Sequence, residues 1–392
     1  MKKYFSITIL MVVMQCVHAQ ADKIVIGNID TLYSTILGEK RTVWVYVPET
    51  ADKKQRFPVL YLLDGEDHFH SAVAIDRQLS GVLPDVIIVG IVNTVRERDL
   101  TPTHVEASAH ESGGGEKFLQ FIEQELMPYI NKKYPAAPYK VFSGHSLGGL
   151  TVVNAFVHHN SMFNAYIALD PSLWWDNKKL LHQAQAMLPT ARFYNKVLFA
   201  AIANNMPPGM DTAAVQYDTL NSNTLVTRST LPFIHALNNT RNNGLRFGYQ
   251  YFPGERHGTV ELLGEYYALH FVFNYYHFDT HVLDENPNLD IDSLVTDHFN
   301  TVSKNLGYTV LPGEDLINNL AYTCMGVNKM HEAYKFFKMN IDNYPTSSNA
   351  YDSMGDYYVS MGNKEKAAES FQKSLDLHET ADTRRKLNEV KK

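Results

Sequence analysis

Residues 140–159 read KVFSGHSLGGLTVVNAFVHH. The first four residues are typical of a short strand, and the segment from Leu150 to His159 is typical of a helix. Between them lies Gly144-His145-Ser146-Leu147-Gly148-Gly149. A sharp strand-to-helix turn strains the backbone of its serine, and small neighbours relieve the crowding. The pattern therefore predicts that the Ser146 hydroxyl is exposed above the carboxyl edge of a sheet.

The flanking sequence predicts that this sheet is mainly parallel. From about Ile24 to Asp279, short strand-like runs alternate with amphipathic helices, among them a helix over Glu116–Tyr134 with a kink at Pro128. Several runs are continuously apolar, which is typical of strands buried on both faces. The alternation favours an α/β domain. The expected strands are Thr42–Val47, Val59–Leu63, Val86–Val92, Lys140–Ser143, Ala165–Leu169, Lys196–Ile202 and Leu245–Phe252.

The character of the sequence changes after about residue 285. We expect a linker over 285–312, which carries Pro287, and a small all-α domain over 313–392. Two helical hairpins in that domain align at an offset of 34 residues, which resembles the tetratricopeptide repeat. A plain helical cap is the alternative. The matching positions are Leu320/Met354, Ala333/Ala367 and Phe337/Phe371.

The N-terminus predicts export. Residues 1–19 begin with Lys2 and Lys3, continue with an apolar run and end in Val17-His18-Ala19, a pattern typical of a secretory signal peptide. The apolar run is too short to span about 30 Å of hydrocarbon. We therefore expect a periplasmic or secreted protein without a membrane span, whose α/β domain occupies residues 20–284.

Composition excludes several classes of protein. The chain has 392 residues, of which 45% are hydrophobic, so it can bury a sizeable core. The formal net charge is −7, so the chain has no excess of basic residues that would indicate a nucleic-acid partner. Two cysteines cannot form a disulfide framework. His68 and His70 lie near two aspartates but have no second ligand cluster, so we predict neither a metal site nor a cofactor.

A serine hydroxyl needs a base within hydrogen-bond reach to act as a nucleophile. His257 is the favoured base among 17 histidines, because it lies in the loop Pro253–Thr259 between the last predicted strand and a long helix. His145, next to the serine, is expected to be structural. The backbone N–H of Leu147, at the start of the helix, is expected to donate to an oxyanion.

Residues of about 25–280 resemble the putative esterase family of α/β-hydrolases, which includes enterochelin (ferric siderophore) esterases, esterase D and feruloyl or acetyl-xylan esterases. The resemblance implies a mainly parallel sheet flanked by helices and a serine carboxylic-ester hydrolase that works through an acyl-enzyme. The matching segments occur in family order and are Tyr61–Glu66, Asn93–Asp99, Leu126–Ile130, Gly144–Gly149, Asp170–Trp175 and Glu255–Thr259.

The resemblance also implies roles for residues around the serine. The backbone near Gly65 or Glu66 would supply a second oxyanion donor. Arg96 and Arg98 would lie at the rim, where a guanidinium suits anionic or catecholate oxygens, unless each forms a surface ion pair with a neighbouring acid. Trp174, with the tryptophan after it, would form an aromatic wall for a ring-bearing substrate or belong to the core.

The triad acid departs from the family pattern. Relatives place it just beyond the strand equivalent to Lys196–Ile202, but here the first acid after that strand is Asp211, in a loop rich in proline and glycine. Glu255 is a rival, because it lies two residues before His257. Side chains two apart on an extended segment face the same side, so the two could be in contact. A Ser–His pair without an acid is the third alternative. We favour Asp211.

These observations predict an exported serine esterase whose substrate is a small-molecule ester, of which siderophore-type esters are the first candidate. A carbohydrate esterase that releases acetyl or feruloyl groups is the second. A non-catalytic scaffold that presents the helical repeats is the third. We expect residues 313–392 to dock on the α/β domain, to self-associate or to bind a protein partner.

Overall fold

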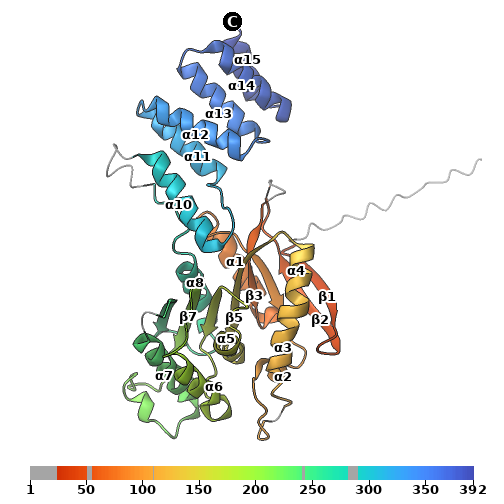
Figure 1. The fold of residues 1–392 in the computed structure, drawn as a ribbon, viewed down its shortest axis with the longest axis vertical. Helices are drawn as coiled ribbons and strands as arrows, with labels where there is room; N and C mark the ends of the chain where they lie inside the picture. The colour runs from red at the N-terminus through yellow and green to blue at the C-terminus, as the bar shows by residue number, and fades with distance from the viewer. Residues whose placement is uncertain (1–23, 51–54, 109, 241–242, 281–289) are drawn as a thin grey trace, which may run out of the picture.

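The computed structural model describes residues 24–50, 55–108, 110–240, 243–280 and 290–392. The predicted signal peptide at 1–19 and the polar start of the predicted linker lie outside these ranges. An α/β part carries the sheet, and a stack of helices forms one end of the molecule (Figure 1). None of the described helices is both long enough and apolar enough to cross a membrane.

The sheet has eight strands in the order β1-β2-β4-β3-β5-β6-β7-β8. The pairs β1–β2 and β2–β4 are antiparallel, and the other neighbours are parallel, so the predicted fold class is confirmed. The strand β1 was not predicted, because its largely exposed side chains give only a weak strand pattern. The strands are β1 Asn28–Ser34, β2 Glu39–Tyr46, β3 Phe57–Leu62, β4 Ile87–Ile91, β5 Ala136–His145, β6 Ala165–Leu169, β7 Lys196–Ala203 and β8 Leu245–Phe252.

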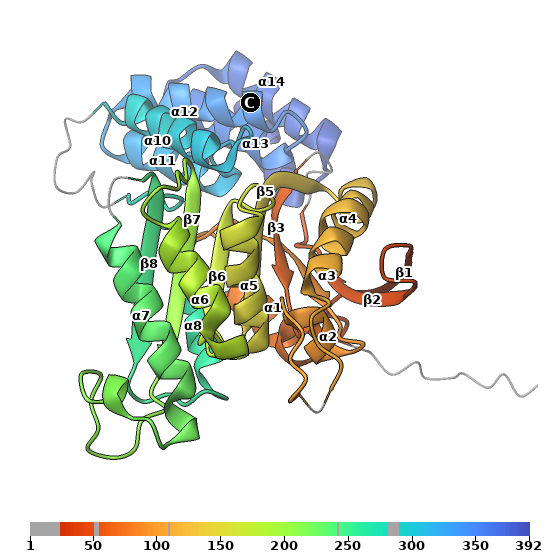
Figure 2. The same ribbon diagram turned by 60° about the horizontal axis from the view of Figure 1, so that its bottom comes forward.

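Helices cover both faces of the sheet and bury two apolar cores. The helices α1 Gly65–Leu79 and α8 Val260–Val272 pack on one face. On the other face, the sheet is covered by α5 Leu147–His158 and α6 Trp175–Met187, with α7 Leu225–Asn239 beside them (Figure 2). Parallel strands thus bring their carboxyl ends to a single edge, from which the loops that carry the candidate site emerge.

The helix predicted over Glu116–Tyr134 is divided in two. α3 Gly115–Phe121 and α4 Met127–Lys133 are joined by a π-helical turn over Ile122–Leu126, and the N–H of Met127 donates to the carbonyl of Ile122. Pro128 lacks the N–H that a regular helix would use at this point. The wider turn accommodates the proline where a simple kink was expected.

The range predicted as a linker, 285–312, contains a helix, because α10 occupies Ile291–Leu306. Ile291 and Val295 pack in the core of the C-terminal helices, whereas Val302 and Leu306 pack in the core beneath α1 and α8. The apolar residues along α10 therefore join the two parts of the molecule. The polar sequence around Pro287 hid this amphipathic helix.

Only helices follow α10. They are α11 Glu314–Gly326, α12 Met330–Asn343, α13 Ser348–Ser360, α14 Lys364–Leu377 and α15 Ala381–Val390. The bounds of α11 and α12 recur 34 residues later in α13 and α14. A Cβ at Gly355 would lie 2.4 Å from the Phe371 ring, which explains the small residue where these two helices touch. Assignment to the tetratricopeptide family stays a prediction.

Candidate active site

Ser146 lies on the predicted turn between β5 and α5. Its backbone has φ 60° and ψ −116°, a left-handed conformation that is strained for a residue with a side chain. A Cβ at Gly144 would lie 2.6 Å from the carbonyl carbon of Gly148, and a Cβ at Gly149 would lie 2.9 Å from Pro171. The glycines are therefore required by close backbone approach, as predicted from the sequence.

The His257 side chain reaches this serine from the loop between β8 and α8. Its Nε2 lies 2.9 Å from Ser146 Oγ, across 111 residues of sequence. The loop is fastened to the segment after β7, since the N–H of His257 donates to Asn205 Oδ1 and Arg256 donates to the carbonyls of Asn204 and Met206. The structure thus brings together the serine and the histidine that the sequence singled out.

Asp170 is the carboxylate behind the histidine. It directly follows β6, its side chain is fully buried, and its Oδ2 lies 2.6 Å from His257 Nδ1. The N–H of Ala203 donates to Oδ1, and the amide of Asn205 donates to Oδ2. With three donors around it, the carboxylate is held in one orientation and enforces the tautomer in which Nε2 faces the serine as an acceptor.

The expectation that Asp211 orients the histidine is wrong. Asp211 Oδ1 instead accepts from the N–H groups of Ala213 and Ala214, so this carboxylate caps its own turn. The rival Glu255 does not hold this place either, because Asp170 occupies the position against His257 Nδ1. A Ser–His pair without an acid is likewise not what the structure contains.

A sequence signal for Asp170 existed. It is the first residue after the strand Ala165–Leu169, and this strand is the parallel neighbour of the nucleophile strand. Its φ of 42° turns the chain sharply at that point. The family resemblance pointed to the end of β7, whereas the acid follows β6, which ends at the same edge of the sheet.

Two helix N-termini lie beside the serine. β3 and β5 are parallel neighbours, so α1, which begins at Gly65, and α5, which begins at Leu147, start at the same edge of the sheet. A Cβ at Gly148 would lie 3.3 Å from the Asp64 carboxylate, which shows how closely the two starts approach. The first N–H groups of a helix have no partner within the helix and attract negative charge.

Arg96 does not have the freedom expected of a residue at the rim. Its Nε and Nη2 donate to the two carboxylate oxygens of Asp64 at 2.7 and 2.9 Å. Asp64 is buried, and the amide of Asn93 donates to it as well. Beside a site where negative charge would develop, the guanidinium compensates the charge of Asp64.

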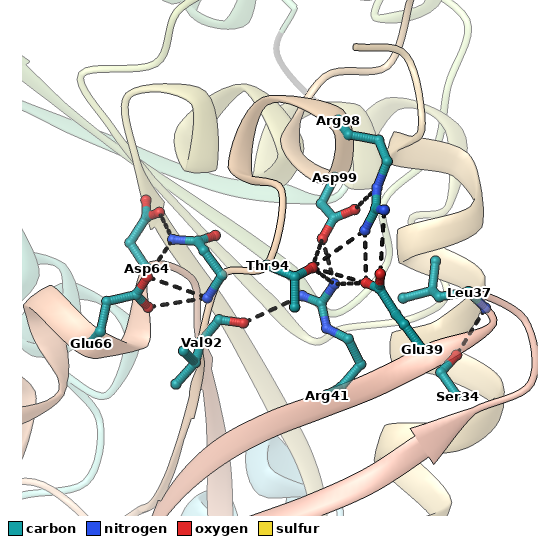
Figure 3. Close-up of polar contacts among 11 residues, drawn as sticks. Ser34, Leu37, Glu39, Arg41, Asp64, Glu66, Val92, Thr94, Arg98 and Asp99 are labelled. Carbon is teal, nitrogen blue, oxygen red and sulfur yellow. Dashed lines mark hydrogen bonds and ion pairs between the residues drawn. The ribbon is translucent and has the colours of Figure 1, made fainter. Parts of the chain in front are cut away.

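Arg98 belongs to a separate cluster, which the close-up in Figure 3 draws with Asp64 and Glu66 beside it. Arg98 pairs with Glu39 and Asp99, and the fully buried Arg41 joins the same two acids. Hydrogen bonding to Arg98 is the main cause that lowers the pKa of Glu39 to about 2. This cluster ties α2 Arg96–Leu100 to β2, and within it Arg98 forms the ion pair with Asp99 that was the alternative to a role at the rim.

A cavity of about 680 Å³ opens over the serine and histidine. Trp174 lines it, as predicted, whereas Trp175 is buried and its indole N–H donates to the carbonyl of Thr103. Arg256 contributes a guanidinium to the described lining. The rest of the lining includes hydroxyl, amide and apolar side chains from Ser172, Asn205, Met206, Pro207, Pro208, Asn221, Ser222, Asn223, Leu225 and Val226.

Comparison with known proteins relates this chain to esterases. A family model described as "Putative esterase" matches residues 34–198, a range that includes Ser146 and Asp170 but ends before His257. The ferri-bacillibactin esterase BesA of Bacillus subtilis is 28% identical in an alignment of 190 residues that covers 42% of this chain and 65% of that protein. The chain spans between about half and two thirds of the length of three curated relatives that it matches.

Solved structures cover more of the chain. An IroE-like serine hydrolase from Shewanella oneidensis is 30% identical, with a TM-score of 0.67, and the match covers 80% of this chain and 98% of that one. An uncharacterised protein from Capnocytophaga ochracea is 20% identical, with a TM-score of 0.63, and the match covers 93% of this chain and 99% of that one. The second likeness shows that the fold, with most of its C-terminal helices, recurs elsewhere.

Proposed function

The chain belongs to an esterase family of the enterochelin-esterase type, and from this premise we propose that it hydrolyses carboxylic esters with Ser146 as nucleophile. His257 is the general base and Asp170 is the residue that orients it. The observation that carries the proposal is the continuous chain of contacts from Ser146 Oγ to His257 Nε2, at 2.9 Å, and from His257 Nδ1 to Asp170, at 2.6 Å.

The first half of the reaction forms an acyl-enzyme. Ser146 Oγ attacks the ester carbonyl while His257 Nε2 takes its proton, and Asp170 stabilises the imidazolium that results. The backbone N–H groups of Leu147 and Gly65 hold the negative oxygen of the tetrahedral intermediate. His257 then gives its proton to the departing alcohol, and the acyl group stays on the serine.

The second half repeats these steps with water. A water molecule attacks the acyl carbonyl through its oxygen, and His257 takes a proton from this water. Collapse of the second tetrahedral intermediate releases the acid and returns the proton to Ser146. The cavity of about 680 Å³ leaves room for both the acyl and the alcohol part of a substrate.

We propose siderophore-type esters as the first substrate class. The support comes from the relatives, among which are esterases named for bacillibactin, triacetylfusarinine C and enterobactin. Trp174 offers a flat apolar surface to an aromatic acyl group. A carbohydrate ester is the second candidate, because amide and hydroxyl side chains such as Asn221 and Ser222 suit a substrate rich in hydroxyl groups.

A fluorophosphonate probe tests the proposed nucleophile. We expect wild-type protein to be labelled once per chain and Ser146→Ala not to be labelled. Peptide mapping supplies the control, since Ser172 Oγ lies only 3.3 Å from Ser146 Oγ and must remain unmodified. Absence of labelling in the wild type would support a non-catalytic scaffold. A panel of p-nitrophenyl, feruloyl, acetyl-xylan and siderophore-lactone esters then separates the substrate classes by kcat/KM.

Two further parts of the proposal concern the rest of the chain. We propose that residues 1–19 direct export and are removed, so the mature N-terminus should be Gln20 when measured by mass spectrometry. We also propose that the helices from α11 onward bind a protein partner or a second copy. Size-exclusion chromatography with light scattering distinguishes a monomer from a self-associated form.

A further inference from the structure

A polar group of residues lies behind the candidate site, on a face of the sheet that is otherwise apolar. Ser143 and His145 are two apart on β5 and therefore face the same side, toward α1 and α8. His68 comes from α1, and Glu261 and Glu265 come from α8. The surrounding residues form one of the two apolar cores. Polar groups in such a core cost stability unless they are paired, so their presence calls for an explanation from function.

The group is only partly paired. Ser143 donates to Glu265 at 2.5 Å, and His68 Nδ1 lies 3.1 Å from Glu261. Glu265 Oε1 and His145 Nε2 are buried and have no hydrogen-bond partner among the described residues. Hydrogen bonding therefore does not fully compensate the burial of the His145 ring.

The contact that distinguishes His145 is with the ring of His257. The two ring centroids are 4.6 Å apart, and the ring planes are tilted by 42°. On its far side, His145 meets His68 edge-on, with centroids 6.1 Å apart and planes at 90°. Three imidazoles thus form a row that runs from the candidate base into the core, with the His145 ring in the middle.

The two hydrogen bonds of His257 do not by themselves fix its ring. They hold Nε2 and Nδ1 while the chain anchors Cβ, but the torsions χ1 and χ2 still allow a small rotation of the ring within the angles that hydrogen bonds tolerate. Such a rotation would carry the Nε2 lone pair out of line with Ser146 Oγ and weaken proton transfer. A ring packed against the imidazole blocks this rotation.

Charge along the row favours the same arrangement. Burial, and secondly the nearby His257, lower the pKa of His145 to about 4, so its ring is neutral where the base must work. Burial lowers the pKa of His68, but the hydrogen bond and charge of Glu261 outweigh it and hold that pKa above its usual value. Protonation is therefore favoured at His68, beside Glu261, and disfavoured at His145, which contacts the ring of His257.

We propose that His145 is a positioning residue, whose ring packs against the ring of His257 and holds the plane in which Nε2 faces Ser146. The inference rests on the proposed esterase function. What matters in this role is the flat shape of the His145 side chain, since the structure shows no hydrogen bond from its ring to the side chain of Ser146 or Asp170, and His145 is not among the described residues that line the cavity. Phenylalanine should therefore replace it, and a side chain without a ring should not.

The test compares His145→Ala, His145→Gln and His145→Phe in the full-length protein. We expect kcat on p-nitrophenyl acetate to fall by about ten- to a hundredfold in the two ringless variants, with KM within about twofold of wild type, because misplacing a catalytic group costs on this order. His145→Phe should recover most of kcat. His158→Ala is the matched control, because His158 is an exposed histidine at the end of α5.

A second measurement is independent of activity. A proton on His257 Nδ1 in a short hydrogen bond to Asp170 gives a proton resonance far downfield, which should persist in wild type and His145→Phe and broaden in the ringless variants. Wild-type kcat together with a sharp resonance in His145→Ala would overturn the proposal, as would equal losses in the alanine and phenylalanine variants. If the wild type hydrolyses no ester, the proposed function fails, and the resonance alone decides whether His145 holds the ring.

Discussion

Asp170 Oδ2 lies 2.6 Å from His257 Nδ1, although the two residues are 87 positions apart in the chain. Each stands at the carboxyl edge of the sheet, Asp170 directly after β6 and His257 in the loop after β8. Between them, the segment after β7 holds both in place, because Asn205 donates to the carboxylate and accepts from the N–H of His257. The acid therefore directly follows a strand of the sheet, and it does not come from the loop that contains Asp211.

Replacing Asp170 tests this assignment. Asp170→Asn should lower kcat by roughly 10⁴-fold, because an amide no longer enforces the productive tautomer of His257. Asp211→Asn should stay within about twofold of wild type, because Asp211 only caps its own turn. The two variants, measured on the same ester, form a matched pair. A larger loss in Asp211→Asn than in Asp170→Asn would restore the acid predicted from the sequence.

Arg96 provides a second prediction. Arg96→Gln should lower kcat by about tenfold or more and change KM little, because it leaves the buried Asp64 carboxylate uncompensated beside the developing oxyanion. Arg192→Gln is a control, since Arg192 is exposed and, within the part of the chain that the structure describes, its guanidinium donates to the carbonyl of Ala191. If KM rises while kcat is unchanged, Arg96 binds substrate directly, as the family resemblance implied.

The C-terminal helices provide a third prediction, which concerns truncated chains. A chain that ends at Pro312 should keep its activity on p-nitrophenyl acetate, because the cavity is lined by residues 146–258 among those described. A chain that ends at Asp290 loses α10 and with it Val302 and Leu306 from the core, so its Tm should fall much further. Equal Tm values for the two truncated chains would contradict the role given to α10. Loss of activity in a folded chain ending at Pro312 would show that the helices complete the site.

Glu265 predicts a pH dependence of stability. Burial is the main cause that raises the pKa of this carboxyl to about 7, well above its value in an unfolded chain. Between about pH 4.5 and 7 the folded state therefore binds a proton that the unfolded state has released, so this group makes stability fall as pH rises through that window. Glu265→Gln should remove this contribution while still accepting from Ser143.

The measurement is Tm at pH 5 and pH 8. Asp76 has a pKa that burial likewise raises to about 7, so the wild type carries two contributions of the same sign. The difference between wild type and Glu265→Gln isolates one of them. We expect the variant to gain stability relative to wild type at pH 8 by about a few degrees in Tm. A difference that is the same at both pH values would show that Glu265 is ionised in the folded protein.

The sequence predicted those parts of the site that are encoded locally. The turn at Ser146 follows from its glycines, and His257 follows from its place between a strand and a helix. Asp170 was missed because the choice between β6 and β7 depends on where distant loops meet. The ion pair of Arg96 could not be located for a similar reason, since its partner Asp64 lies 32 residues away. The amphipathic α10 was hidden by the polar sequence before it.

The central claim is that Ser146 and His257 act as one catalytic unit. Its most direct test is the rate of p-nitrophenyl acetate hydrolysis by Ser146→Ala and His257→Ala beside the wild type, each checked for an unchanged circular dichroism spectrum. We predict that each variant loses on the order of 10⁴-fold or more in kcat and that the double variant loses no more than either alone. Hydrolysis at a near-wild-type rate by either folded variant would contradict the account.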